Sequence, residues 1–367
     1  MRRRRWLRRL RRRVGGMLVP KEMRYVSLHS HSTYSYMDGF GLPEAHVERV
    51  AELGMKALAL TEHGNVSSHV KLEQAAKKHG IKPIFGLEAY TAPMTMREDG
   101  NTRKWHMTML ATDLVGLNNL YSMVTTSWER DFYRWPTVLG DSFRDHNKGI
   151  IALSGCADSH LACTLLGGKG IEEGNYDAAV KVMLGYKRLL GDRYYLECQR
   201  FPGLERSRIL NQQYALWSAE YGIPLAASSD VHYPHPSENE MQKILHAAGR
   251  NTGTVAAAEA GWEYDILLTY PESDKQILDD LVATGLTKKE AMSAIVNTEE
   301  IASRCNVELP KMDRIRYPGT TDDLKPWPRK TQSSGSTQTA GDATPADTSA
   351  PAAVRRRRTS RRSASAR

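Results

Sequence analysis

The sequence has 367 residues, of which 40% are hydrophobic and 25% are charged, as is typical of folded globular proteins with one large domain or two small ones. It contains no run of about 18 apolar residues, which argues against a transmembrane helix. The formal net charge of +9 is unevenly distributed, because residues 1–24 and 319–367 are strongly basic and residues 25–318 are acidic overall.

The first 23 residues are rich in arginine, with runs at Arg2–Arg5 and Arg11–Arg13. They include no apolar stretch of the length that a secretory signal needs, and we expect a disordered arm. Such an arm is either solvated and inert, including the case in which translation starts at Met17 or Met23, or binds phosphate backbones non-specifically. Four cysteines without a CxxC pair predict reduced thiols and a cytoplasmic protein.

The central part of the chain alternates between short β-branched or apolar runs and longer segments with apolar residues at helical spacing. We expect seven strands, at 25–29, 56–61, 81–90, 105–111, 149–154, 193–198 and 225–230. Helices are expected between them at 43–53, 67–79, 113–128, 176–190 and 204–221. This alternation predicts parallel βαβ units, and seven or eight of these usually close into a barrel with its site at the carboxyl ends of the strands.

The first strand ends in two histidines, His29 and His31, and Asp38 follows. Alternate residues of a strand face the same side, so both imidazoles can reach one point. This geometry suits a metal ion. A His-x-His pair by itself is weak evidence, because such short patterns also occur by chance.

Further candidate ligands lie at the ends of the later strands: His63, Glu88, His106, Cys156, Asp230 and His232. Imidazole, thiolate and carboxylate groups together are typical ligands of Zn²⁺ and similar transition metals. A single histidine after a strand is more often a core or hydrogen-bonded residue. The concentration of candidates at one end of successive strands favours a metal site.

The remaining histidines show no ligand spacing, and we expect them at surfaces or helix caps: His46, His69, His79, His146, His160, His235 and His246. Trp105, Tyr34 and Tyr36 could stack on nucleic-acid bases, although aromatic residues beside strands more often belong to the core.

Six motifs resemble those of the PHP (polymerase and histidinol phosphatase) domain: His29-Ser30-His31 with Asp38-Gly39, Thr61-Glu62-His63-Gly64, Gly86-Leu87-Glu88, His106, Ser154-Gly155-Cys156 and Asp230-Val231-His232-Tyr233. The resemblance is strongest to the PHP domain at the N-terminus of bacterial DNA polymerase III alpha subunits. It implies an α/β fold, a distorted (β/α)7 barrel, with the barrel domain at 24–270 and a helical end of the module at 271–318. The arm at 1–23 and a tail at 319–367, rich in Ser, Thr, Ala, Pro and Arg, are expected to be disordered.

The resemblance also implies three divalent metal ions (zinc, manganese or magnesium). One would be bound by His29, His31, Glu88 and Asp230, a second by Glu88, His106 and Cys156, and the third by Asp38, His63 and His232. The expected nucleophile is a metal-bound hydroxide, because clustered cations lower the pKa of water and stabilise the leaving alkoxide. Glu62, Arg103 and Lys104 are candidates for contact with the substrate, although charged loop residues are usually solvated.

The implied activity is metal-dependent phosphoester hydrolysis, as a 3′→5′ exonuclease that acts on DNA in replication or proofreading, near the nucleoid. Two alternatives stay open. One is a non-catalytic scaffold that docks to a separately encoded polymerase palm or to other replisome subunits, and the other is a phosphate monoesterase of the histidinol-phosphatase type. Cysteine at position 156 favours the polymerase branch. We expect no nucleotidyl transfer by this chain alone, because the low-complexity sequence after residue 318 offers no palm domain.

Overall fold

The computed structural model describes residues 13–14, 17–18, 23–93, 104–168, 171–249, 254, 256 and 266–311. These belong to one compact unit, Met1–Lys311. Within the predicted arm the described residues are Met23 and the strands β1 (Arg13–Val14) and β2 (Met17–Leu18), which pair in antiparallel fashion. The rest of the predicted arm and the predicted tail at 319–367 lie outside the described residues, so the domain boundaries stay predictions.

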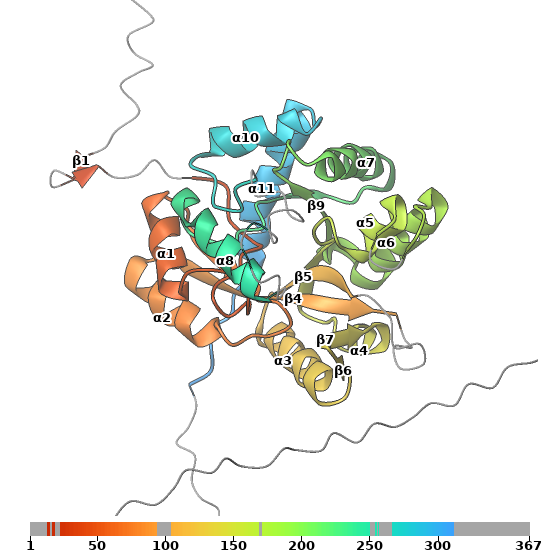
Figure 1. Cartoon of the computed structure of the whole chain (residues 1–367), viewed down its shortest axis with the longest axis horizontal. Coiled ribbons are helices and arrows are strands. Elements are labelled where there is room, and N and C mark those ends of the chain that lie inside the picture. Colours follow the sequence, from red (N-terminus) through yellow and green to blue (C-terminus); the bar gives the residue numbers. More distant parts are fainter. Residues whose placement is uncertain are drawn as a thin grey trace, which may run out of the picture. The chain divides into compact units, whose positions relative to one another are not determined.

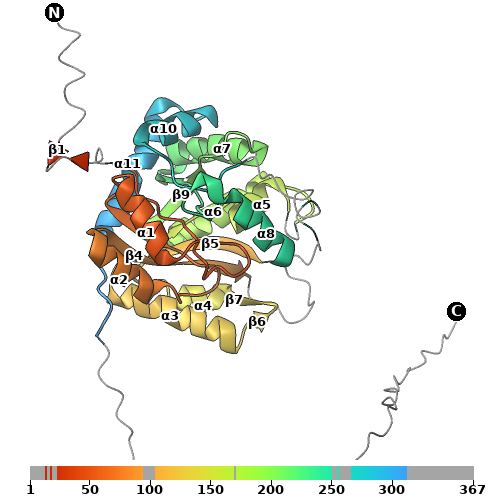
Figure 2. The same ribbon diagram turned by 60° about the vertical axis from the view of Figure 1, so that its left-hand side comes forward.

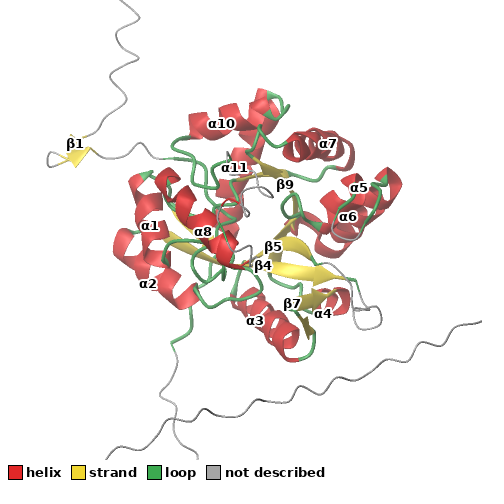
Figure 3. Ribbon diagram, in the orientation of Figure 1, coloured by secondary structure: helices red, strands yellow, loops and turns green. Residues whose placement is uncertain are grey.

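Strands form the centre of the fold, and helices surround them (Figures 1 and 3). Six of the seven predicted strands are present, and neighbours in their order pair with each other: β3 (Ala57–Leu60), β4 (Lys82–Ala92), β5 (Trp105–Ala111), β8 (Ile150–Leu153), β9 (Tyr194–Gln199) and β10 (Leu225–Ser228).

The remaining predicted strand, at 25–29, is the first segment of the chain. It pairs only through isolated parallel bridges, Ser27 with Leu58 and Ser30 with Val231. Leu58 lies on β3, and Val231 lies just after β10. The first segment of the chain therefore sits between β3 and the end of β10, and it closes the sheet into a distorted seven-stranded barrel.

The prediction of parallel strands throughout is wrong at β5, which runs antiparallel to both β4 and β8. No helix was predicted in residues 93–104, which join β4 to β5, and an antiparallel pair needs no crossover helix. Because β5 is reversed, its amino end lies beside the carboxyl ends of its parallel neighbours. A short unpredicted hairpin, β6 (Phe132–Tyr133) with β7 (Trp135–Leu139), extends the sheet, and β7 pairs with the end of β4.

The five predicted helices are confirmed to within two residues at each end, as α1 (Pro43–Glu52), α2 (His69–His79), α3 (Leu114–Glu129), α6 (Tyr176–Leu190) and α7 (Glu205–Tyr221). Side-chain caps at Asp113 and Asn175 fix the starts of α3 and α6. Further helices are α4 (Gly140–Asp145), α5 (His160–Leu166), α8 (Asn239–Gly249), α10 (Asp274–Ala283) and α11 (Lys288–Arg304), with short 3₁₀ turns at Gly191–Arg193 and Pro236–Glu238. Among the described residues, no helix combines the length and apolar character needed to cross a bilayer.

Helix α11 lies across the amino ends of the parallel strands (Figure 2). Its Thr298 hydroxyl accepts a hydrogen bond from the Val26 amide, and its Asn297 side chain donates to the Leu225 carbonyl at the start of β10. Lys82, at the start of β4, donates to the Ala302 carbonyl. Ile301 and Ala302 of α11 join a buried cluster with residues from all seven strand segments. The helix therefore closes one end of the barrel and leaves the opposite end for a site.

Two histidines expected at surfaces or caps are buried instead, which corrects that prediction. His69 donates from Nε2 to the Gly86 carbonyl at 2.9 Å. His46 donates from Nε2 to the Phe40 carbonyl at 3.0 Å, and its Nδ1 lies 2.8 Å from the Tyr270 hydroxyl. Burial lowers the pKa of each imidazole to about 4, because the charged form would lose its hydration.

These two lowered pKa values predict acid sensitivity. The unfolded chain binds more protons than the folded chain below the ordinary histidine pKa, so stability is present above about pH 6.5 and is lost as the pH falls towards about 4. Between pH 7 and 5 each histidine should remove about 2 kcal/mol from the free energy of unfolding. Urea unfolding at both pH values checks this. His69→Gln should reduce the loss and the more exposed His79→Gln should not, and equal losses in both variants would contradict the assignment.

Candidate metal centre

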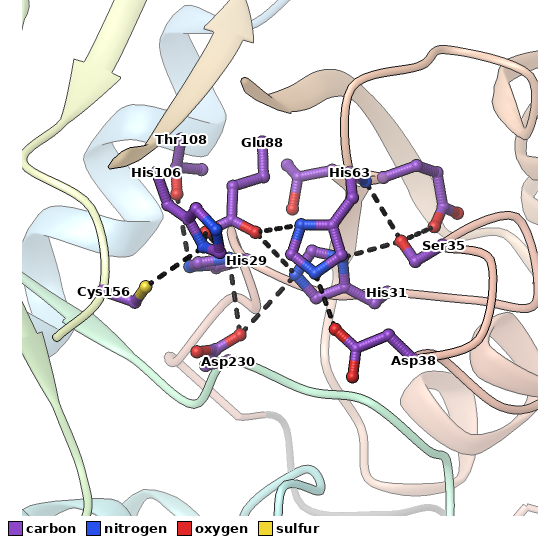
Figure 4. A network of polar contacts seen from close by, with 12 residues as sticks. His29, His31, Ser35, Asp38, His63, Glu88, His106, Thr108, Cys156 and Asp230 are labelled. Atoms are coloured by element: carbon purple, nitrogen blue, oxygen red, sulfur yellow. Dashed lines mark hydrogen bonds and ion pairs between the residues drawn. The ribbon is translucent and has the colours of Figure 1, made fainter. Parts of the chain in front are cut away.

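All nine predicted metal ligands lie at the barrel end opposite α11. Figure 4 labels eight of them, all except His232. The first segment provides His29 and His31, and the loop after it provides Asp38. The others are on or next to the strands: His63 after β3, Glu88 on β4, His106 at the start of β5, Cys156 after β8, and Asp230 and His232 after β10. The reversal of β5 explains how a residue near the start of a strand joins residues at the ends of the others.

Glu88 occupies the centre of this group and is almost completely buried, with 1% exposure. Its Oε1 lies 3.2 Å from His29 Nε2 and 3.3 Å from His106 Nδ1. Its Oε2 lies 2.6 Å from His63 Nδ1 and 3.4 Å from His31 Nε2. One carboxylate therefore contacts four imidazoles, which is the arrangement expected of a bridging ligand.

Asp230 faces His29 and His31, two of the four histidines that Glu88 contacts. Its Oδ1 lies 3.4 Å from His29 Nε2 and 3.6 Å from His31 Nε2, and its Oδ2 accepts a hydrogen bond of 2.9 Å from the Gln199 amide. The backbone of Asp230 has φ = 43°, in the left-handed region that residues other than glycine rarely adopt. Such strain persists where the surrounding structure holds a side chain in place, often at functional sites.

Asp38 forms a second carboxylate focus. His63 Nε2 lies 2.8 Å from its Oδ2, and His232 Nε2 lies 3.3 Å from the same atom. His246 on α8 donates to Oδ1 at 2.6 Å. The expectation that His246 sits at a surface or cap is wrong, since it is buried against Asp38. No local sequence pattern indicates this contact, because 208 positions separate the two residues.

The donor set fits divalent metal ions. Within the described residues His29 Nε2, His31 Nε2, His63 Nδ1 and both oxygens of Glu88 are buried and make no aligned hydrogen bond. Buried polar atoms nearly always have a hydrogen-bond partner, so a convergent group of nitrogen and oxygen atoms without one is an arrangement that a divalent cation would satisfy. Ligand atoms of three overlapping groups lie within 4.8 Å of one another: His31 with His63 and His232, His29 with His31 and Glu88, and His63 with Glu88 and His106. Cys156 is at the edge, with Sγ 3.6 Å from His106 Nδ1.

Hydrogen bonds behind the first two histidines orient their free nitrogens. His29 Nδ1 donates to Glu197 Oε1 at 2.7 Å. His31 Nδ1 lies 2.9 Å from Ser35 Oγ, whose own proton goes to Glu62 at 2.6 Å, so His31 is the donor. In both rings Nδ1 is the donor, so in the neutral imidazole the Nε2 lone pair faces Glu88, as metal ligation requires.

The charged groups of the site strongly shift one another's pKa values. Burial alone would raise the pKa of Glu88, but His106, His29 and His63 outweigh it and hold this pKa well below its usual value. Burial lowers the pKa of His31 to about 3, with a further contribution from neighbouring His63. Asp38 and Asp230 overcome the effect of burial at His232 and raise its pKa to about 9. The carboxylates thus stay ionised at neutral pH, ready to bind cations.

The three predicted substrate contacts have different outcomes. Glu62 is completely buried and accepts hydrogen bonds from Ser32 and Ser35. A direct contact with substrate does not fit this position, and we propose that Glu62 instead orients His31 through Ser35. Lys104 is buried just before β5, and Arg103 lies outside the described residues, so their roles stay predictions.

A cleft of about 620 Å³ opens onto the site. His63, Glu88, His106, Cys156, Asp230 and His232 line one part of it, and Phe201, Leu204, Ile266 and Leu268 form an apolar part. The Arg206 guanidinium also lines the cleft, where it donates to the carbonyls of Ala157 and Gly167. The cleft is therefore large enough for a small phosphate ester or the end of a nucleic-acid strand. The positively charged Arg206 lies near the candidate ligands.

Comparison with known proteins shows a match of residues 27–201 to the PHP domain. The chain is 28% identical over 313 residues to DNA polymerase III subunit alpha of Helicobacter pylori, covering 82% of this chain and 24% of that protein. It is 30% identical over 314 residues to the subunit of the same name from Deinococcus radiodurans, covering 83% and 22%. The chain thus spans about a quarter of the length of these curated relatives.

Among solved structures, a putative metal-dependent phosphoesterase from Bifidobacterium adolescentis matches 56% of this chain and 87% of its own, with 15% identity and a TM-score of 0.39. Histidinol phosphate phosphatase from Lactococcus lactis, complexed with zinc, L-histidinol and phosphate, matches 65% and 95%, with 14% identity and a TM-score of 0.30.

Proposed function

We propose that this chain, whose residues 27–201 match the PHP domain and which is similar to part of DNA polymerase III alpha subunits, is a metal-dependent phosphoesterase that removes nucleotides from the 3′ end of DNA. The observation that carries the proposal is the convergence, around Glu88, of buried histidine and glutamate atoms that make no hydrogen bond. The named relatives favour DNA over a small ester as the substrate. A role in replication or proofreading, close to the nucleoid, is part of the same proposal.

Three divalent ions, zinc, manganese or magnesium, are proposed for the nine residues in the sets given above, with Glu88 shared between two of them. Divalent cations would supply Lewis acidity towards a phosphodiester and a lowered pKa for water. The protein's own contribution is to hold ionised carboxylates and correctly oriented imidazoles at one point. Glu197 and the Ser35–Glu62 pair fix the two first-segment rings, and the Arg206 side chain places positive charge on the wall of the cleft.

The basic ends of the sequence are proposed to raise the affinity for DNA through contacts with its phosphates, so that binding weakens as salt rises. A separately encoded polymerase palm, or other replisome subunits, are the proposed protein partners. Both proposals rest on the relatives and on the charge distribution of the sequence.

The deciding experiment uses the purified full chain with Mn²⁺, Zn²⁺ or Mg²⁺ and three substrates: a 5′-labelled single strand, a 3′-labelled single strand and p-nitrophenyl phosphate. We expect a ladder of products that shorten from the 3′ end, dependent on metal and absent in His29→Ala and Asp230→Asn. Rapid turnover of the monoester with intact DNA would assign the chain to the phosphatases. Bound metal without turnover of any substrate would favour the scaffold alternative.

A further inference from the structure

Four exposed aromatic side chains follow one another closely in the sequence near the candidate metal centre, where Trp128 stacks on Phe132 and Tyr133 pairs with Trp135 across the β6–β7 hairpin. Trp128, Phe132, Tyr133 and Trp135 are 51%, 48%, 47% and 51% exposed. They come from the end of α3 and from the β6–β7 hairpin, which lie next to β4 (Figure 1). We call these four residues the aromatic platform. Exposed apolar surface of this kind commonly marks a binding site.

The platform is connected to two predicted metal ligands by a series of ring contacts. The Trp135 ring centroid lies 5.2 Å from that of Tyr90. The Tyr90 ring in turn lies 5.6 Å from His63 and 5.3 Å from His106. Flat surfaces therefore follow one another from the exposed platform to the centre.

Backbone contacts hold the platform in place. The Trp128 indole N–H donates to the Gly64 carbonyl at 2.9 Å, one residue from His63. Gly64 has φ = +62°, and a Cβ atom there would lie 2.6 Å from Pro136 Cγ and 3.1 Å from the Tyr90 ring. Glycine thus allows the hairpin to pack closely against the His63 segment. Stacking of Trp128 on Phe132, with centroids 5.3 Å apart, further limits ring motion.

Arg134 adds positive charge to the platform. It lies at the turn between β6 and β7, and its guanidinium carbon is 5.7 Å from the Tyr133 ring centroid. No ion pair joins Arg134 to another residue in the described parts of the chain. A cation next to flat rings complements the phosphate and base of one nucleotide, since bases stack on aromatic rings while phosphate attracts arginine.

We propose that the aromatic platform and Arg134 form a stacking subsite for unpaired bases of a nucleic-acid strand whose end lies at the metal centre. This inference deepens the proposed function and depends on it for the identity of the neighbouring site. Bases within a duplex are stacked on each other and cannot lie on the platform. The subsite therefore selects single strands over duplexes and over esters that lack a base.

The test measures binding without turnover. The full chain in EDTA is titrated against two fluorescent oligonucleotides of equal length and charge, one of thymidine and one with an abasic backbone, and anisotropy gives both affinities. The wild-type protein should prefer the thymidine strand. Trp135→Ala should reduce the ratio of the two affinities about 5- to 150-fold, the usual range for loss of one stacking ring. Trp135→Phe should keep most of the preference.

Two further variants sharpen the result. Tyr176→Ala removes a similarly exposed ring, 47% exposed, from α6, and the wild-type ratio should remain. Arg134→Gly suits the left-handed backbone at this turn, where φ is 62°. This substitution should weaken the binding of both oligonucleotides equally, because both contain the same phosphates.

Equal affinity of the wild-type protein for the two oligonucleotides would overturn the inference, as would an equal loss for both in Trp135→Ala. Sedimentation at the assay concentration tests whether a second copy of the chain binds the platform instead. A dimer that Trp135→Ala dissociates would show that the platform is a contact between two copies, and would overturn the inference. Because no hydrolysis is needed, an inactive protein with a base-dependent preference would defeat the proposed function and leave the subsite supported.

Discussion

Substitution of Glu88 by glutamine is expected to lower kcat/KM for phosphoester hydrolysis about 1,000-fold, equivalent to about 4 kcal/mol of transition-state stabilisation. Both oxygens of Glu88 face imidazole nitrogens, within 2.6 to 3.4 Å of four histidines. The glutamine side chain has no negative charge to attract a cation. Its NH₂ group would also face a histidine nitrogen that must itself bind the cation. Metal content per chain, measured by mass spectrometry of the dialysed protein, should fall together with activity.

Glu48→Gln is the matched control, because Glu48 is an exposed glutamate on α1. It should keep the metal content and the rate of the wild-type protein. Circular dichroism must show that Glu88→Gln is folded. A folded Glu88→Gln protein with full metal content and activity within tenfold of the wild type would contradict the central position of this carboxylate.

Removal of metal is expected to lower the melting temperature by about 10 °C. A ligand present at about 1,000 times its Kd stabilises the folded state by about 4 kcal/mol, and about 1 kcal/mol shifts the melting temperature by 2–4 °C in a domain of this size class. The physical cause is the concentration of ionised groups that burial keeps from water, including Glu88 and Asp230, whose hydration cations would replace. Calorimetry of the protein dialysed against EDTA, before and after addition of Mn²⁺ or Zn²⁺, measures the shift.

The Glu88→Gln protein provides an internal check on this second prediction, since its melting temperature should respond far less to added metal. Identical melting temperatures of the wild-type protein with and without metal, at concentrations that restore full occupancy, would show that the centre contributes nothing to stability.

Local sequence patterns were sufficient for most of the barrel. Strand and helix periodicities placed seven strand segments and five helices, and the positions of His29, His31 and Glu88 at strand ends indicated where side chains would meet. The direction of β5 was not predictable in this way, because an apolar run reads the same in parallel and antiparallel pairing. The fold class follows from the sequence, while the reversed strand follows only from the structure.

The surroundings of the site were less predictable for a different reason. Glu62 follows a strand and carries a charge, so it resembled a solvated loop residue, yet Ser32 and Ser35 satisfy its oxygens inside the protein. His246 reaches Asp38 from a helix far along the chain. Burial and long-range contacts of this kind depend on packing between elements, which no local spacing records.

The closure of the barrel sets the order in which the protein can form during synthesis. The amides of Tyr25 and Val26 are bonded to Asp274 and Thr298, 249 and 272 positions further along the chain. The first strand can therefore take its final place only after α11 has left the ribosome, and contacts of such sequence separation form slowly. Until then the apolar side chains of Val26 and Leu28 lack part of their buried cluster, so a nascent chain that stalls before α11 would be a substrate for chaperones and prone to aggregation.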